Sequence, residues 1–148
     1  MITVEDILMG KDAEIIVAPS TTTVLDAAKL MAKDQIGSIV IRDHDKVLGI
    51  FTERDLLCRV VAVGKNPAAL VLADVMSSPV NACRLSDDVR TCARILSDTN
   101  TRHLVVVEED TLMGLISLRD IQAARARVPW SQSLDDPSDI VIPVFYDG

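Results

Sequence analysis

The spacing of apolar residues changes in a fixed order along the first half of the chain, and this order predicts its secondary structure. Residues 14–18, which are apolar from residue 15 onward, predict a short strand that Pro19 ends. The next apolar residues recur on one helix face: Val24, Ala27, Ala28 and Met31. Two further apolar runs, residues 38–41 and 47–51, flank a polar turn and predict a β-hairpin. After Thr52 the spacing is helical again and places three residues on one face: Leu56, Val60 and Val63.

The same order of spacings returns 65 residues later without a gap. Residues identical at this separation are Val24/Val89, Ala28/Ala93, Val40/Val105, Asp45/Asp110, Gly49/Gly114, Arg54/Arg119 and Asp55/Asp120. An internal repeat of this kind indicates one structural unit used twice. We therefore predict an α+β protein with two β-α-β-β-α repeats, bounded at residues 1–64 and 65–127. Short helices at residues 3–9 and 68–76 are expected to lead into the repeats.

Residues 128–148 lie outside the repeat and differ from it in composition, because they hold the only Trp and the only Tyr. The apolar run at residues 140–146 is expected to dock on the repeats or on a second copy of the chain. A partly ordered tail is the alternative.

Composition places the chain among ordinary globular proteins of one-domain size, with 49% hydrophobic and 25% charged residues. No apolar stretch approaches the ~18–20 residues that span a bilayer, and the acidic start lacks a signal-peptide pattern. We therefore expect a cytoplasmic protein that does not associate with membranes. The three cysteines have no CxxC spacing and indicate buried or incidental thiols rather than a metal set or a disulfide framework.

A net charge of −7 argues against a long polyanion as ligand, because nucleic-acid binders carry a basic face. A weak single-stranded nucleic-acid binder is thus disfavoured. The charge says little against one small anion, since the second half contains a group of arginines: Arg90, Arg94, Arg102, Arg119, Arg125 and Arg127.

One motif occurs once in each repeat, with the pattern Gly-apolar-apolar-[Ser/Thr]-x-x-Asp, at residues 49–55 and 114–120. It places a hydroxyl and a carboxylate after a predicted strand, on the first turn of a helix, where α/β folds commonly bind small ligands. A carboxylate can accept hydrogen bonds from both hydroxyls of a ribose, and a helix N-terminus can bind a phosphate. The same pattern also fits a helix N-cap with an acid at the third position, which needs no ligand.

These two motifs, each after a predicted hairpin, resemble those of a tandem pair of CBS domains, the cystathionine-β-synthase-type repeat or Bateman module. The resemblance covers residues 1–127, and segments 74–80 and 102–107 also follow the family pattern. It implies two repeats packed as a pseudo-twofold pair with two clefts. Ligands implied by the resemblance contain adenosine: AMP, ADP, ATP, NAD-type dinucleotides or S-adenosylmethionine.

In such a site Asp55 and Asp120 would hold the ribose, while Thr52 and Ser117 would face the phosphate. The resemblance places residues of the first strand of each repeat beside the base: Ile16, Val17, Asn81 and Ala82. It also implies that Arg102 and His103 contact phosphate, at positions where the first repeat has only Gly37 and Ser38. Arg119 is a further candidate for phosphate. We therefore predict that Asp120, more than Asp55, anchors the nucleotide.

The sequence predicts a regulatory module that binds an adenine nucleotide, AMP or ATP, and senses a metabolite or the energy state through dimer geometry. Nothing in it provides a catalytic nucleophile, general base or metal set, so we expect no enzyme and no required cofactor. A homodimer is expected because the helix after Thr52 is apolar on more than one face, and a protein regulated by this module is a further candidate partner. The alternative is an interaction module whose clefts are vestigial.

Overall fold

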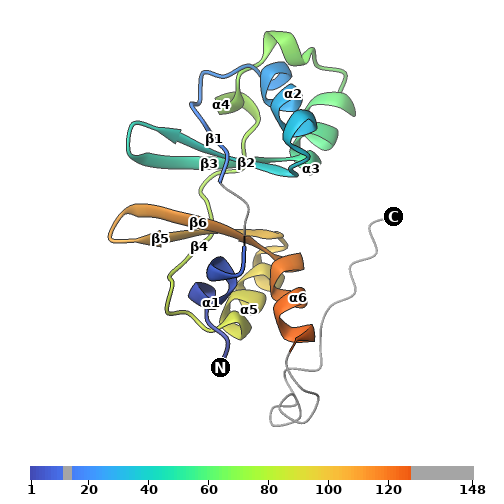
Figure 1. The fold of residues 1–148 in the computed structure, drawn as a ribbon. Helices are drawn as coiled ribbons and strands as arrows, with labels where there is room; N and C mark the ends of the chain where they lie inside the picture. Colours follow the sequence, from blue (N-terminus) through green and yellow to red (C-terminus); the bar gives the residue numbers. More distant parts are fainter. Residues whose placement is uncertain (12–14, 128–148) are drawn as a thin grey trace. The chain divides into compact units, whose positions relative to one another are not determined.

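The computed structural model describes residues 1–11 and 15–127, and the statements below concern these residues; the tail that is expected to dock lies outside them. The helices and strands follow one another as drawn in Figure 1. In chain order they are α1 (Val4–Met9), β1 (Val17–Ala18), α2 (Val24–Asp34), β2 (Ser38–Asp43), β3 (Lys46–Thr52), α3 (Glu53–Leu56), the π-helix η1 (Leu57–Val61), the 3-10 helix η2 (Pro67–Ala69), α4 (Leu72–Val75), β4 (Ala82–Cys83), α5 (Val89–Thr99), β5 (His103–Glu108), β6 (Thr111–Ser117) and α6 (Leu118–Ala126). None of these helices is long and apolar enough to cross a membrane.

Two compact units make up the structure, and neither is continuous in sequence. The first-repeat unit contains the described residues from 15 to 80 together with 109–112, and the second-repeat unit contains residues 1–11, 81–108 and 113–127. Helix α1 thus packs with the second repeat, although it precedes the first, and α4 packs with the first repeat. The boundaries predicted at residues 1–64 and 65–127 follow the sequence repeat rather than these contacts, and they stay a prediction.

Each unit contains one three-stranded sheet, with orders β1-β2-β3 and β4-β5-β6. In the first sheet β1 runs parallel to β2, and β2 runs antiparallel to β3 with Ser38 opposite Thr52. The second sheet repeats the parallel pairing, with Ala82 opposite Val105. The starts of the first two strands and the end of the third therefore meet at one end of the sheet. This α+β architecture confirms the predicted fold class.

The long helix of each unit buries the stripe that the sequence predicts. Three residues of α2 and three of α5 are buried, 65 positions apart: Val24, Ala27 and Met31, then Val89, Cys92 and Leu96. Each stripe belongs to the hydrophobic core of its own unit. The caps match as well, because both helices end on a left-handed residue, Gln35 with φ 55° and Asn100 with φ 52°.

Two helical segments differ from the sequence-based prediction. The prediction of a single helix after Thr52, with Val63 on the same face as Leu56 and Val60, is wrong, because Val63 is 57% exposed whereas Val60 is buried. The helix changes to π-type hydrogen bonding at Leu57, where the amide of Ala62 donates to the Leu57 carbonyl over 2.8 Å. This wider turn shifts the register of later side chains away from the 3.6-residue period. The lead-in expected at residues 68–76 is divided between η2 and α4.

The repeated glycines Gly49 and Gly114 make a matched test of packing. A Cβ atom at Gly49 would lie 2.7 Å from the Met76 sulfur and 2.8 Å from the backbone oxygen of Ser77, whereas the three atoms nearest to one at Gly114 all belong to the Leu8 side chain, the first at 2.8 Å. A side-chain end can move aside more easily than backbone. Gly49→Ala is therefore expected to lower the free energy of unfolding by about 1–3 kcal/mol, and Gly114→Ala by clearly less. Urea unfolding of both variants measures this, and equal losses would contradict it.

Candidate ligand site

The predicted site residues gather at one end of each sheet. In the first-repeat unit Ser38 begins β2 opposite Thr52, and the carbonyl of Ile16, next to Val17 of β1, accepts a hydrogen bond from Val40 over 3.0 Å. In the second-repeat unit the carbonyl of Asn81 accepts the equivalent bond from Val105, again over 3.0 Å.

The residue before the middle strand also contacts the first turn of the following helix. The carbonyl of Gly37 accepts from the amide of Glu53 over 3.0 Å, and the carbonyl of Arg102 accepts from the amide of Leu118 over 2.9 Å. The backbone of Arg102 is thus held directly beside Ser117. His103 follows as the first residue of β5, Ala82 is exposed on β4, and Arg119 is exposed on α6. Their roles toward a ligand stay predictions.

Ser117 and Asp120 form a capping box at the start of α6. The Ser117 amide donates to Asp120 Oδ2 over 2.8 Å, and the Asp120 amide donates to Ser117 Oγ over 3.1 Å. The helix that follows is nine residues long, so its first amides and its dipole favour negative charge at this end. This cap explains why the sequence places a hydroxyl and a carboxylate three residues apart.

Lys11 is a third member of this site, which the sequence did not reveal. Its Nζ atom donates to Asp120 Oδ2 and to the carbonyl oxygen of Leu115, both over 2.9 Å. The side chains of Lys11 and Asp120 are 26% and 21% exposed. Burial alone would raise the pKa of Asp120, but the hydrogen bonds from Lys11 and Ser117 and the charge of Lys11 outweigh it and hold this pKa below the ordinary 3.8.

The lowered pKa of Asp120 predicts how the ion pair depends on pH. Lys11→Met should lower the free energy of unfolding by about 1 kcal/mol near neutral pH, as expected for a partly exposed pair. A carboxyl whose pKa is lower in the folded state stabilises the fold above its unfolded pKa, and this contribution is lost as pH falls through the folded value. Urea unfolding should thus give a constant difference at higher pH that shrinks below pH 3.8. A difference that persists into strong acid would assign the loss to the apolar stem of Lys11 instead.

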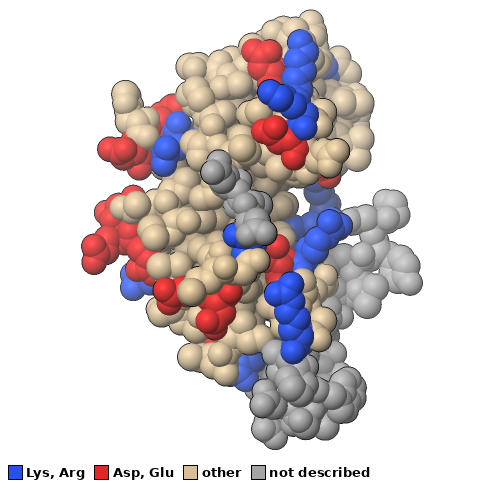
Figure 2. Space-filling view, in the orientation of Figure 1, with Lys and Arg blue, Asp and Glu red and all other residues tan. Residues whose placement is uncertain are grey.

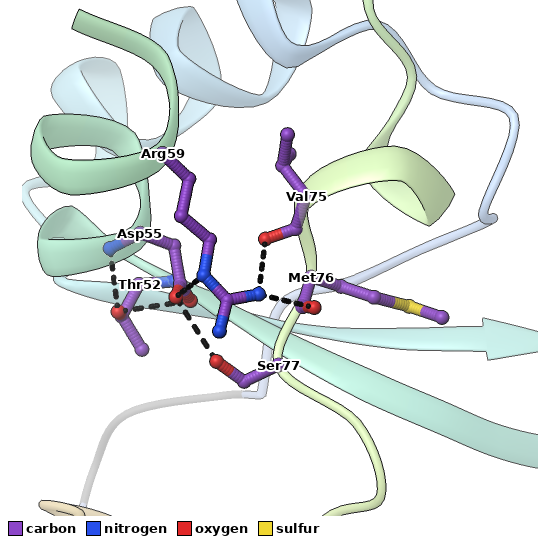
Figure 3. A network of polar contacts seen from close by, with 6 residues as sticks. All are labelled: Thr52, Asp55, Arg59, Val75, Met76 and Ser77. Carbon is purple, nitrogen blue, oxygen red and sulfur yellow. Dashed lines mark hydrogen bonds and ion pairs between the residues drawn. The ribbon is translucent and has the colours of Figure 1, made fainter. Parts of the chain in front are cut away.

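The equivalent carboxylate in the first repeat, Asp55, lies in a closed polar network (Figure 3). Its Oδ2 accepts from the Thr52 amide over 2.9 Å and from the Thr52 hydroxyl over 3.1 Å. Its Oδ1 accepts from the Ser77 hydroxyl over 3.0 Å and lies 3.6 Å from Arg59 Nε. Arg59 in turn donates to the carbonyls of Val75, over 3.3 Å, and Met76, over 2.9 Å. Asp55 is the one buried charged residue among those described.

The two sites are therefore not equivalent in their open hydrogen-bonding capacity. Both oxygens of Asp55 have partners and its side chain is 8% exposed, whereas the contacts of Asp120 within the described residues all use Oδ2. Arg59 and Ser77, like Lys11, are contacts that sequence reasoning missed. The one available signal was the capping motif itself, which requires a carboxylate but does not say which distant donors reach it.

Charge is unevenly distributed over the second-repeat unit (Figure 2). In this view Lys and Arg side chains gather over α6, while acidic side chains gather over the turn between β5 and β6. The candidate site at the start of α6 thus lies on an element rich in positive charge, although the chain as a whole carries −7. Such an arrangement favours a small anion at this end of the sheet.

Two β-α-β-β-α units, each with a capped carboxylate at the end of its sheet, define a tandem-repeat α+β module. The chain belongs to the CBS-domain family, whose model matches residues 4–62 and again residues 72–127. Tandem CBS domains are generally regulatory, non-catalytic modules that bind adenosine-containing ligands.

Relatives and solved structures agree with this family. An uncharacterized protein of Methanopyrus kandleri is 34% identical over 110 residues, which cover 73% of this chain and 56% of that protein. The chain therefore spans little more than half the length of this relative. A CBS-domain protein from Burkholderia ambifaria has 31% identity and a TM-score of 0.79, covering 84% of this chain and 93% of its own. A CBS-domain protein from Agrobacterium tumefaciens has 30% identity and a TM-score of 0.78, covering 84% and 99%.

Proposed function

We propose that the chain is a regulatory module that binds an adenine nucleotide, AMP or ATP, at the second-repeat site and responds through the geometry of a homodimer. The observation that carries this proposal is the state of Asp120. It is an ionised, partly exposed carboxylate on the first turn of a nine-residue helix, and its described contacts use only one oxygen. Such a group can accept a hydrogen bond from a ribose hydroxyl with the strength of a charge-assisted bond.

Each part of a nucleotide has a candidate partner near Asp120. The ribose would lie against the carboxylate, and the phosphate would face Ser117 and the positive end of the α6 helix dipole. Arg102 supports this arrangement because its carbonyl accepts a hydrogen bond from the Leu118 amide. Its backbone therefore lies next to the position proposed for the phosphate. Asn81 and Ala82 start the neighbouring strand and would flank the base. We assign the first-repeat site a weaker role, because both oxygens of Asp55 are already engaged.

A thermal-shift screen with AMP, ATP, NADH and S-adenosylmethionine tests the function. A ligand at one hundred times its dissociation constant should stabilise the fold by about 2.7 kcal/mol, which appears as a higher melting temperature. Adenine and ribose 5-phosphate at equal concentration are suitable controls, since each carries only part of the recognised group. Absence of any shift with all four ligands would favour the alternative of an interaction module with vestigial clefts.

The proposed dimer has a candidate surface in the first-repeat unit. Three apolar residues on and after η1 are strongly exposed: Leu57 at 59%, Val61 at 62% and Val63 at 57%. Leu57 and Val61 lie four residues apart in one helical segment, and a contiguous exposed apolar patch commonly marks an interaction surface. Light scattering at micromolar concentration should give the mass of two chains for the wild type, and Val61→Lys should shift it toward one. A monomeric wild type would refute the homodimer.

A further inference from the structure

In each repeat a carbonyl of the last strand and the carboxylate that caps the following helix accept hydrogen bonds from one distant residue. This donor residue differs between the two repeats. In the first-repeat unit Ser77 donates its amide to the carbonyl of Ile50 over 2.8 Å and its hydroxyl to Asp55 over 3.0 Å. The equivalent acceptors 65 residues later are Leu115 and Asp120. Both receive the ammonium group of Lys11, over 2.9 Å each. One lysine side chain thus takes the place of the amide and hydroxyl of a serine.

This replacement changes how firmly the carboxylate is held. Ser77 is fixed in place because its amide and carbonyl both pair with Ile50, in a bridge of 2.8 and 3.0 Å. The ammonium of Lys11 lies at the end of a flexible four-carbon side chain, so it can leave Asp120 without breaking any backbone pairing. Asp55 therefore accepts a hydrogen bond from a fixed neutral donor, and Asp120 accepts one from a movable charged donor.

Moving the ammonium has a cost that depends on the charge of the ligand. Lys11 is about three-quarters buried, so it needs a counter-charge when it leaves Asp120. A neutral nucleoside whose two ribose hydroxyls bind both oxygens of Asp120 would displace the ammonium from Oδ2 and leave it with the Leu115 carbonyl alone. A ligand with a phosphate would supply a new anion for it.

We propose that Lys11 is the residue that makes the second-repeat site select phosphorylated ribose ligands over the neutral nucleoside. This inference rests on the proposed nucleotide-binding function. It adds that the ligand must carry a negative charge and that Lys11 is the residue that distinguishes it from a neutral one. The ammonium of Lys11 donates to Asp120, the carboxylate that would hold the sugar, so that ribose binding and phosphate binding are coupled through it.

Calorimetry with AMP and with adenosine, on wild type and Lys11→Met, tests this proposal. The wild type should bind AMP more tightly than adenosine, by roughly tenfold or more, as for a charge-assisted bond. In Lys11→Met the two dissociation constants should approach each other, because adenosine no longer competes with the ammonium and AMP loses its counter-ion. Lys11→Arg keeps a cation and should keep the preference. Lys29→Met, an exposed residue of α2 in the other unit, is the matched control.

The outcomes separate this inference from the function on which it rests. If Lys11→Met keeps the wild-type preference for AMP over adenosine, Lys11 does not select for the phosphate. The proposed nucleotide site would then remain, but this inference would be wrong. If AMP and adenosine bind neither wild type nor any variant, the proposed function fails and the inference with it. Circular dichroism on each variant confirms that the comparison is made between folded proteins, and Lys11→Arg provides the second folded variant.

Discussion

Replacing Asp55 with alanine is expected to destabilise the fold by about 2–4 kcal/mol, the range for removing a buried charged group from its hydrogen bonds. The Asp55 carboxylate accepts from the amide and the hydroxyl of Thr52 and from the hydroxyl of Ser77. Its loss leaves these donors without an acceptor inside the protein. Arg59 is half-exposed and can turn to water, which keeps the estimate below the largest values for buried pairs. Urea unfolding with a two-state fit measures the effect.

Asp120→Ala is the matched control for this prediction, since the residue lies at the same place of the second repeat. Its side chain is 21% exposed, against 8% for Asp55, so water can reach the groups that it leaves behind more easily than those around Asp55. A loss of about 1–2 kcal/mol is expected, from the N-cap contact and the partly exposed ion pair with Lys11 together. Equal losses at the two positions would show that the closed network around Asp55 adds nothing beyond helix capping.

The fold was predictable because its determinants are local or repeated. The stripe of Val24, Ala27 and Met31 needs only a helical period, and its return at residue 89 identifies a second unit. The capping motif also acts within four residues, so Thr52 and Ser117 could be placed at helix starts from the sequence alone.

Other features depend on contacts between distant segments and left no local signal. Lys11 reaches Asp120 across 109 positions, and Ser77 reaches Asp55 across 22 positions. Neither partner follows from a periodicity, since any donor that folding brings near can satisfy a carboxylate. The packing of α1 with the second repeat is of the same kind. The π-helix after Leu56 was missed because an α-helical period was assumed throughout.

Asp120→Asn is expected to weaken AMP binding roughly ten- to a hundredfold, the value of one charge-assisted hydrogen bond. Asparagine keeps the size of the side chain, and its oxygen can still accept from the Ser117 amide, so the cap and the fold should remain. What it removes is the negative charge that would accept from the ribose. Calorimetry with AMP or ATP measures the change, and the melting temperature without ligand confirms that the fold is retained.

Asp55→Asn is the matched control for Asp120→Asn, because the two aspartates occupy equivalent positions of the two repeats. Since the two oxygens of Asp55 are engaged by Thr52 and Ser77, its substitution should lower stability while leaving AMP affinity within about twofold, the scatter expected for a site that makes no contact. Equal weakening by both variants would disprove the asymmetry and indicate that the two repeats share the ligand. Unaltered binding in both variants would assign both aspartates to helix capping alone and would place the nucleotide elsewhere.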